Sequence, residues 1–229
     1  MTTRTHSHWL AQLRARWLAH WLLKGIGITA SITLFMAVYF MLLKNPQHTV
    51  RVMPLVALDH RVAFVPWAVW PYVSLWLYIG AAPSLLRLRA EMWRYVLSVT
   101  AVAVIGCAVF YFWPTMVPDF AIEWSNWPAL ALIKATDASG NACPSLHVAF
   151  AVLSAIWLQH LLQTVKAPLW AHATNFAWCG LIVWSTMATR QHVALDVAAG
   201  IVLGGVAAIG CIRWLPDAAV ASRPVAPVE

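Results

Sequence analysis

The chain has 229 residues, of which 62% are hydrophobic and 10% charged, and its formal net charge is +7. A soluble domain carries about 25% charged residues, so this composition excludes an ordinary water-soluble domain, because too few polar side chains remain to cover its surface. The basic residues form short clusters between apolar runs, which indicates membrane topology rather than a nucleic-acid partner as the reason for the positive charge.

Residues 1–24 form a distinct N-terminal segment. Trp9, Leu13, Trp17 and Trp21 follow one another at helical spacing with basic residues between them. This pattern predicts an amphipathic helix that lies on the cytoplasmic leaflet. A straight helical extension of the first membrane span explains the pattern equally well.

Residues 25–214 predict an all-α, polytopic membrane domain. A spanning helix needs about 20 predominantly apolar residues. Six stretches meet this requirement: 25–43, 67–86, 93–113, 146–162, 169–188 and 192–214. Residues 215–229 are rich in Pro and Ala and predict a disordered cytoplasmic tail.

Lys and Arg are distributed unequally between the two sides of this predicted bundle. Ten of the fifteen lie in the N-terminal segment, the second and fourth loops and the tail, and five lie in the opposite loops. Because Lys and Arg concentrate in cytoplasmic loops, we expect both termini in the cytoplasm.

The first polar segment whose residues could take part in a reaction leads into the fourth predicted span. Pro144 suits the first position of a helix, and the N–H groups of the next three residues, Ser145 to His147, would then form an anion site. Ser145 adds a hydroxyl and His147 a titratable ring. Other candidate phosphate-binding residues upstream are Asn141, Asp137 and Lys134.

The second polar segment leads into the sixth predicted span. His192 and Asp196 are four residues apart and share one face of a helix. A carboxylate inside a membrane span needs a partner, and here it would fix the tautomer of His192. Arg190 offers a forked donor for phosphate. A purely structural His–Asp pair and an interfacial Arg are the alternatives.

Both polar segments are expected at the same outer face, and together they suit phosphoryl transfer. In this interpretation one histidine attacks phosphorus, Asp196 orients it, and the other histidine protonates the leaving oxygen. A structural role for Gly200-x-x-x-Gly204 is also expected, because small residues at this spacing allow helices to approach closely.

Residues 144–147, Pro-Ser-Leu-His, resemble the Pro-Ser-x-His motif of the type 2 phosphatidic acid phosphatase (PAP2) superfamily, and His192-x-x-x-Asp196 resembles the end of its third motif. The Leu in the first motif, the Arg190-Gln-His192 run and the segment 59–72 are similar to the branch of inositol phosphorylceramide and sphingomyelin synthases.

The resemblance implies a phosphohistidine on His192, with His147 as general acid and Asp196 as orienter. It implies no metal and no cofactor, a membrane lipid as substrate, and a site on the periplasmic face of the bacterial cytoplasmic membrane. The oligomeric state stays open.

The chain departs from the superfamily pattern in its phosphate-binding residues. The Arg expected six residues before the nucleophile is Thr186, and the first motif, a Lys followed by Arg-Pro, is absent. Arg190 and Lys134 are the candidate replacements.

Three functions remain open at this point. A lipid phosphate or pyrophosphate phosphatase uses water as acceptor, whereas a head-group phosphotransferase uses a lipid alcohol. A non-enzymatic transporter or assembly protein would carry the His–Asp pair for structural reasons.

Overall fold

The computed structural model describes residues 3–136 and 141–214. This part of the chain is nearly all-α, as the sequence predicts, and includes two short strands. In chain order the elements are α1 (Thr3–Leu18), α2 (Trp21–Lys44), β1 (Arg51–Val52), α3 (Ala57–Arg61), the 3-10 helix η1 (Pro66–Ala68), α4 (Val69–Val73), α5 (Leu75–Ser84), α6 (Arg89–Phe112), β2 (Thr115–Met116), the 3-10 helix η2 (Trp124–Asn126), α7 (Pro128–Thr136), α8 (Leu146–Thr164), α9 (Leu169–Ala188) and α10 (Ala194–Trp214). The predicted tail, 215–229, lies outside the described residues.

Four of the described helices, α2, α6, α8 and α10, are long and apolar enough to cross a membrane, which identifies an integral membrane protein. The other two predicted spans differ from these. The stretch 67–86 divides at Ser74 into α4 and α5, each shorter than the roughly 20 residues of a span. Helix α9 is long enough, but it is not among the described helices that are both long and apolar enough to cross a membrane. The count of six crossings therefore stays a prediction.

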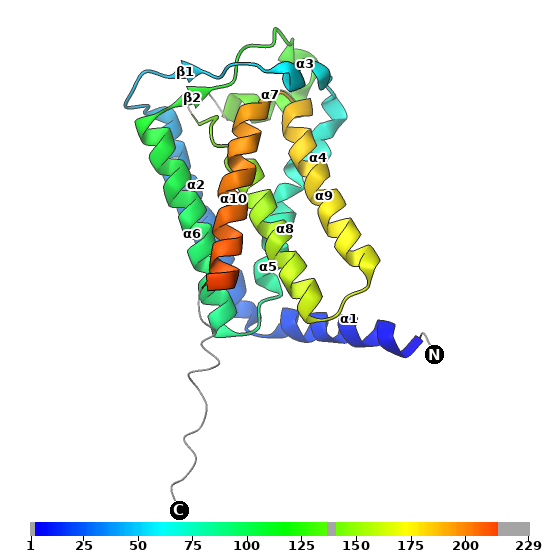
Figure 1. The fold of residues 1–229 in the computed structure, drawn as a ribbon. Helices are drawn as coiled ribbons and strands as arrows, with labels where there is room; N and C mark the ends of the chain where they lie inside the picture. The colour runs from blue at the N-terminus through cyan, green and yellow to red at the C-terminus, as the bar shows by residue number, and fades with distance from the viewer. Residues whose placement is uncertain (1–2, 137–140, 215–229) are drawn as a thin grey trace, which may run out of the picture.

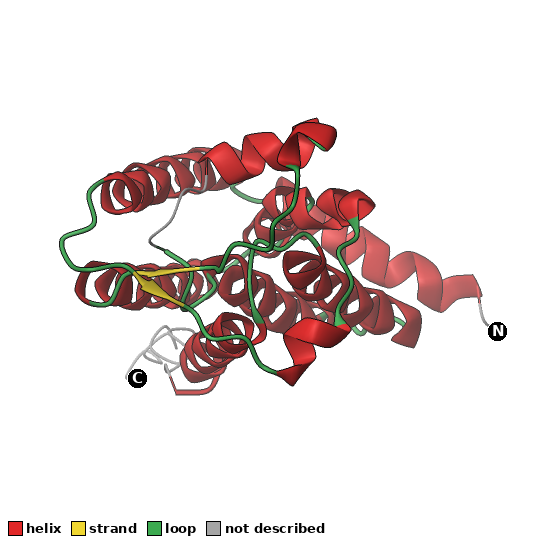
Figure 2. Cartoon of the chain, turned by 90° about the horizontal axis from the view of Figure 1, so that it is seen from above, coloured by secondary structure: helices red, strands yellow, loops and turns green. Residues whose placement is uncertain are grey.

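The long helices lie side by side, and short elements gather at one end of them (Figure 1). At this end, which we call the cap end, β1 pairs in parallel with β2, with Arg51 opposite Thr115. Thr115 also forms a bridge with Asn141. Figure 2 shows the strands and loops of the cap end from above. The loop before α8 is therefore part of the same layer as the strands.

Helix α1 lies across the opposite end, which we call the α1 end (Figure 1). The chain turns at His20, whose φ is 53°, so α1 is not a straight extension of α2 and that alternative is wrong. Trp9 is buried against Leu162, Val165 and Ala171. The N-terminal segment is therefore a separate helix that packs under the loop between α8 and α9.

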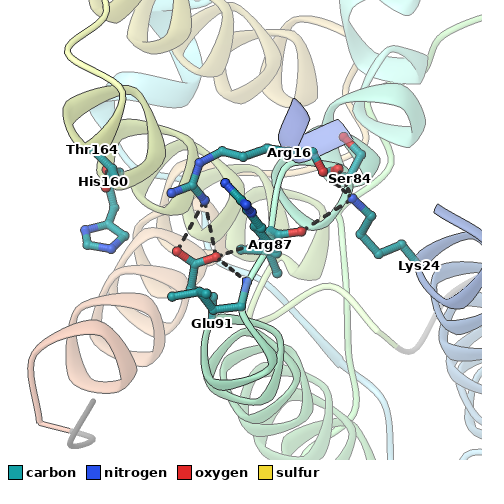
Figure 3. Close-up of polar contacts among 9 residues, drawn as sticks. Arg16, Lys24, Ser84, Arg87, Glu91, His160 and Thr164 are labelled. Atoms are coloured by element: carbon teal, nitrogen blue, oxygen red, sulfur yellow. Dashed lines mark hydrogen bonds and ion pairs between the residues drawn. The ribbon is translucent and has the colours of Figure 1, made fainter. Parts of the chain in front are cut away.

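Two basic residues fasten α1 to the bundle (Figure 3). The Arg16 guanidinium lies 3.2 Å from the Glu91 carboxylate, which also accepts the N–H of Leu88 just before α6. The Lys24 ammonium donates to the carbonyls of Ser84 (2.6 Å) and Arg16 (2.8 Å). These carbonyls lie at the C-terminal ends of α5 and α1, where a helix favours a cation.

Helix α8 is the most deeply buried of the four candidate spans, and α10 packs directly against it. A Cβ atom on Gly200 would meet the Ser145 carbonyl oxygen, and one on Gly204 would meet the Ala149 carbonyl oxygen. Only glycine allows backbones to approach this closely. The packing role predicted for Gly200 and Gly204 is confirmed, and it brings the start of α10 to the start of α8.

Candidate active site

The two polar segments meet at the cap end, where α8 begins and where a turn leads into α10. The N–H of Ser145 donates to the carbonyl of Asp196 at 3.0 Å. This backbone hydrogen bond joins the first motif directly to the second. The prediction that the two segments lie at the same end of the bundle is confirmed.

His192 and Asp196 form a buried pair, with 6% and 0% of their surfaces exposed. His192 Nδ1 lies 3.1 Å from Asp196 Oδ2, and Asp196 Oδ1 accepts the N–H of Val193 at 2.9 Å. Helix α10 begins at Ala194, so His192 lies in the turn before the helix and not on it as expected. Because the carboxylate holds Nδ1, Nε2 is the ring nitrogen suited to attack phosphorus.

His147 lies on the first turn of α8, and its ring stacks on Tyr72 of α4. The ring centroids are 4.0 Å apart and the planes differ by 18°. His147 also hydrogen-bonds to the Tyr72 backbone and interacts electrostatically with His192. Its Nε2 atom is buried and has no hydrogen-bond partner among the described residues. Because such a group costs about 1–3 kcal/mol, this nitrogen is suited to bind a ligand oxygen.

Ser145 serves as the N-cap of α8. Its hydroxyl accepts the N–H of Val148 at 3.3 Å, and its own N–H is taken by Asp196. Pro144 therefore precedes the cap, whereas the sequence predicts it at the first helical position. The N–H of Ser145 is one of the three donors of the expected anion site at the start of α8. Because the Asp196 carbonyl accepts it, this site loses one donor.

A pocket of about 290 Å³ lies at the cap end, with His192 in its wall. Polar side chains from three segments line it, namely Lys134 of α7, Asn141 before α8 and Gln191 before α10. Lys134 is the one Lys or Arg among the described lining residues. The pocket therefore combines the proposed nucleophile with a cation and two amides.

The structure brings two of the predicted phosphate-binding residues to His192. Asn141 is 7% exposed and donates to the Tyr39 carbonyl of α2 at 3.4 Å. The Lys134 ammonium lies 5.9 Å from the centre of the Trp124 ring. Asp137, a third candidate, lies outside the described residues. Roles for these residues in substrate binding stay predictions.

Arg190 lies in the turn between α9 and α10, with a φ of 57°. Its guanidinium donates to the carbonyls of Asp59 at 3.1 Å and Val62 at 2.7 Å, and it lies 4.6 Å from the centre of the Phe120 ring. Of the predicted catalytic and binding residues, four are not among the described residues that line the pocket: Arg190, Ser145, His147 and Asp196. The donors of Arg190 are thus directed to α3 and the residue after it.

Two residues of the site, Asp59 and Tyr72, received no role from the sequence. Asp59 is 3% exposed, and its Oδ1 accepts the N–H of Ala194, the first residue of α10, at 2.7 Å. A carboxylate at the third position of a short helix signals a cap for that helix. Nothing in the sequence indicates that it also caps a helix 135 residues away.

The arrangement offers a nucleophile, its carboxylate partner, a second histidine and a nearby cation, which suits transfer of a phosphoryl group. Burial and the Asp196 carboxylate raise the pKa of the Cys143 thiol, so this neighbouring thiol stays neutral and competes poorly as a nucleophile. Among the described residues, no group of three or more His, Cys, Asp or Glu is placed to hold a metal ion.

Comparison with known proteins agrees with this chemistry at the level of a family. Curated proteins and solved structures gave no match. The family model of the PAP2 superfamily, whose members are generally phosphatases or phosphotransferases, matches residues 91–219. The match contains His147, His192 and Asp196 and covers more than half of the 229 residues. The chain therefore belongs to the PAP2 superfamily.

Proposed function

We propose that this protein is an integral membrane lipid phosphatase that hydrolyses a lipid phosphate or pyrophosphate through a phosphohistidine on His192. The observation that carries the proposal is the buried His192–Asp196 pair, whose His192 lies in the wall of a pocket that Lys134 also lines. The hydrogen bond from the Ser145 N–H to the Asp196 carbonyl supports it. This bond holds the segment that carries His147 beside the segment that carries His192, and the reaction needs an acid near the nucleophile.

In the first step His192 Nε2 attacks phosphorus, and the bond between phosphorus and the leaving lipid oxygen breaks. His147 donates a proton to that oxygen, and Asp196 stabilises the positive charge on the His192 ring. Water then attacks the phosphohistidine, His147 accepts a proton from this water, and inorganic phosphate leaves. Lys134 and Asn141 hold the phosphoryl oxygens in both steps.

We place the pocket on the outer, periplasmic face of a bacterial cytoplasmic membrane, with both termini in the cytoplasm. If α4 and α5 together form one crossing and α9 forms another, the four candidate spans become six crossings. Six crossings place both termini on the same side of the membrane. The excess of Lys and Arg in the N-terminal segment, the second and fourth loops and the tail supports this orientation. A phosphate on a membrane lipid would then meet the pocket at the headgroup level.

The apolar side of the same pocket favours a second candidate function. Val117, Phe120 and Trp124 form part of its wall. A wall that excludes water would preserve the phosphohistidine until a lipid alcohol arrives. The protein would then be a head-group phosphotransferase, as in the inositol phosphorylceramide and sphingomyelin synthases that the sequence resembles.

The test is phosphate release by the purified protein from a panel of lipid phosphates and pyrophosphates, with and without a lipid alcohol. His192→Ala is the test variant. His48→Ala is the matched control, because His48 is an exposed histidine in the loop before β1 at the same end of the bundle. We expect release that is lost in His192→Ala and retained in His48→Ala.

The products separate the candidates. Inorganic phosphate from every active donor supports the phosphatase, and a new phospholipid that appears with the alcohol supports the phosphotransferase. If the folded protein neither releases nor transfers phosphate from any donor, both proposals fail and the non-enzymatic interpretation takes their place.

A further inference from the structure

The segment 56–72 lies outside the family match, yet it contacts the residues around both histidines of the site. We propose that Asp59 and Tyr72 are positioning residues that orient His192 and His147 for phosphoryl transfer. We further propose that Arg190 fastens this segment to the turn that carries His192 and does not bind phosphate. This inference rests on the proposed function and extends it.

Asp59 fixes the start of α10. Its Oδ2 accepts the N–H of Val56 at 2.8 Å, which caps its own helix α3, and its Oδ1 accepts the N–H of Ala194 at 2.7 Å. Asp196 takes the preceding N–H, that of Val193, at 2.9 Å. Two buried carboxylates thus hold successive N–H groups of the turn that immediately follows His192.

Arg190, in the turn before α10, also contacts the segment that carries Asp59. It donates to the backbone carbonyls of Asp59 and Val62, and the N–H of Val65 donates to the carbonyl of Ala188 at 2.9 Å. Residues 56–65 are therefore fastened to residues 188–194 in both directions. Because the donors of Arg190 bind carbonyls, its guanidinium acts on His192 through the backbone.

Tyr72 orients the ring of His147. Its ring covers the His147 ring face to face, and its backbone hydrogen-bonds to His147. Tyr72 is 8% exposed, so the packing around it leaves little freedom to the stacked pair. These two contacts set the direction of Nε2, the atom that has no partner among the described residues.

The first test concerns Arg190→Lys, because a lysine lacks the planar fork of N–H donors through which Arg190 contacts the Asp59 and Val62 carbonyls. We expect kcat to fall about 10- to 100-fold from misplacement of His192, with KM little changed. A raised KM with an unchanged kcat would instead identify Arg190 as a phosphate ligand and overturn the assignment. Glu123→Gln, at an exposed carboxylate of the cap end, is the control and should retain the wild-type constants.

The second test uses Asp59→Asn together with a pair at Tyr72. Asp59 accepts the two N–H groups with its two different oxygens, and Asn has an NH2 donor in place of one of them, so we expect a 10- to 100-fold loss of kcat. Tyr72→Leu removes the stacked ring and should lose activity to a similar degree, and Tyr72→Phe, which keeps the ring, should lose less. If folded Asp59→Asn and Tyr72→Leu both keep the wild-type kcat, the proposal is wrong.

A third measurement does not depend on activity and separates this inference from the proposed function. Diethyl pyrocarbonate modifies histidines, and mass spectrometry gives the labelling of His192 and His147 relative to exposed His48. We expect each ratio to change about fivefold, the effect of one lost hydrogen bond, at His192 in Asp59→Asn and at His147 in Tyr72→Leu. Unchanged ratios overturn the positioning role, whether or not the wild-type protein proves to be a phosphatase.

Discussion

At the scale of single residues, the two histidines of the site are held in different ways. His192 is bound to the Asp196 carboxylate, which would stabilise the positive charge of the proposed phosphohistidine. His147 is bound to a backbone group and an aromatic ring, with no carboxylate in those contacts. This difference supports His192, rather than His147, as the proposed nucleophile.

The role of His147 predicts a dependence on the leaving group. His147→Asn should lower kcat for a lipid phosphate about 10²- to 10⁴-fold, the usual contribution of general acid catalysis. The loss should be much smaller with p-nitrophenyl phosphate, because its leaving group needs no proton. Phosphate release from the two substrates, with His48→Ala as control, makes the comparison. Equal losses for both substrates would contradict the acid role.

The role of Lys134 predicts a binding effect. Lys134→Ala should raise KM about 10-fold with a small change in kcat, as expected for the loss of one hydrogen bond to a charged group. Lys166→Ala, an exposed lysine at the α1 end, should leave both constants at their wild-type values. A KM unaffected by Lys134→Ala would exclude this residue from the phosphate site.

At the scale of elements, three helices begin in the same way. Asp59, Glu91 and Asp196 are the third residues of α3, α6 and α10, and each accepts an N–H from the residue just before its helix. Each carboxylate also has a second partner: Ala194, Arg16 and His192, respectively. The cap of a helix and a contact between distant segments are therefore made by the same side chain.

Close packing of α8 and α10 predicts different tolerance at two adjacent glycines. Gly204→Leu should displace α10 from the Ala149 backbone and destabilise the protein by about 1–3 kcal/mol or more, with loss of activity. Gly205→Leu should be tolerated, because a Cβ atom at Gly205 would meet no other atom within 4 Å. Thermal unfolding in detergent and phosphate release make the comparison. Equal effects at the two positions would contradict the packing argument.

At the scale of the whole molecule, the two ends of the bundle differ in their polar contacts. The α1 end holds the Arg16–Glu91 pair and the Lys24 contacts to helix C-termini. The cap end holds the pocket and the His192–Asp196 pair. A substrate that reaches His192 must therefore approach from the cap end.

The orientation predicts how the two ends react with an impermeant maleimide in intact cells. In a background without the four native cysteines, Thr49→Cys at the cap end should be labelled. Gln163→Cys at the α1 end should be labelled only after the membrane is opened. Both positions are exposed, so the membrane alone separates them. The reverse pattern would place the site on the cytoplasmic face.

Much of this molecule could be predicted from local pattern. Apolar runs of sufficient length predict helices in lipid, because every backbone group must be paired within its own segment. Gly200 and Gly204 are four residues apart and had to share a face once a helix formed. His192 and Asp196 have the same spacing, and their pair forms although His192 lies in the turn before α10. The sequence by itself therefore determined the membrane class, the His–Asp pair and the contact between α8 and α10.

The tertiary structure decided what the long-range hydrogen bonds join. The sequence makes Arg190 a candidate phosphate ligand, and packing of α3 against the turn presents the Asp59 and Val62 carbonyls to it. Asp59 likewise takes the first N–H of a helix 135 residues away, and Tyr72 reaches His147 through a stacked ring. A donor pairs with whichever acceptor packing brings near, and that choice depends on the whole bundle and not on neighbouring residues in the chain.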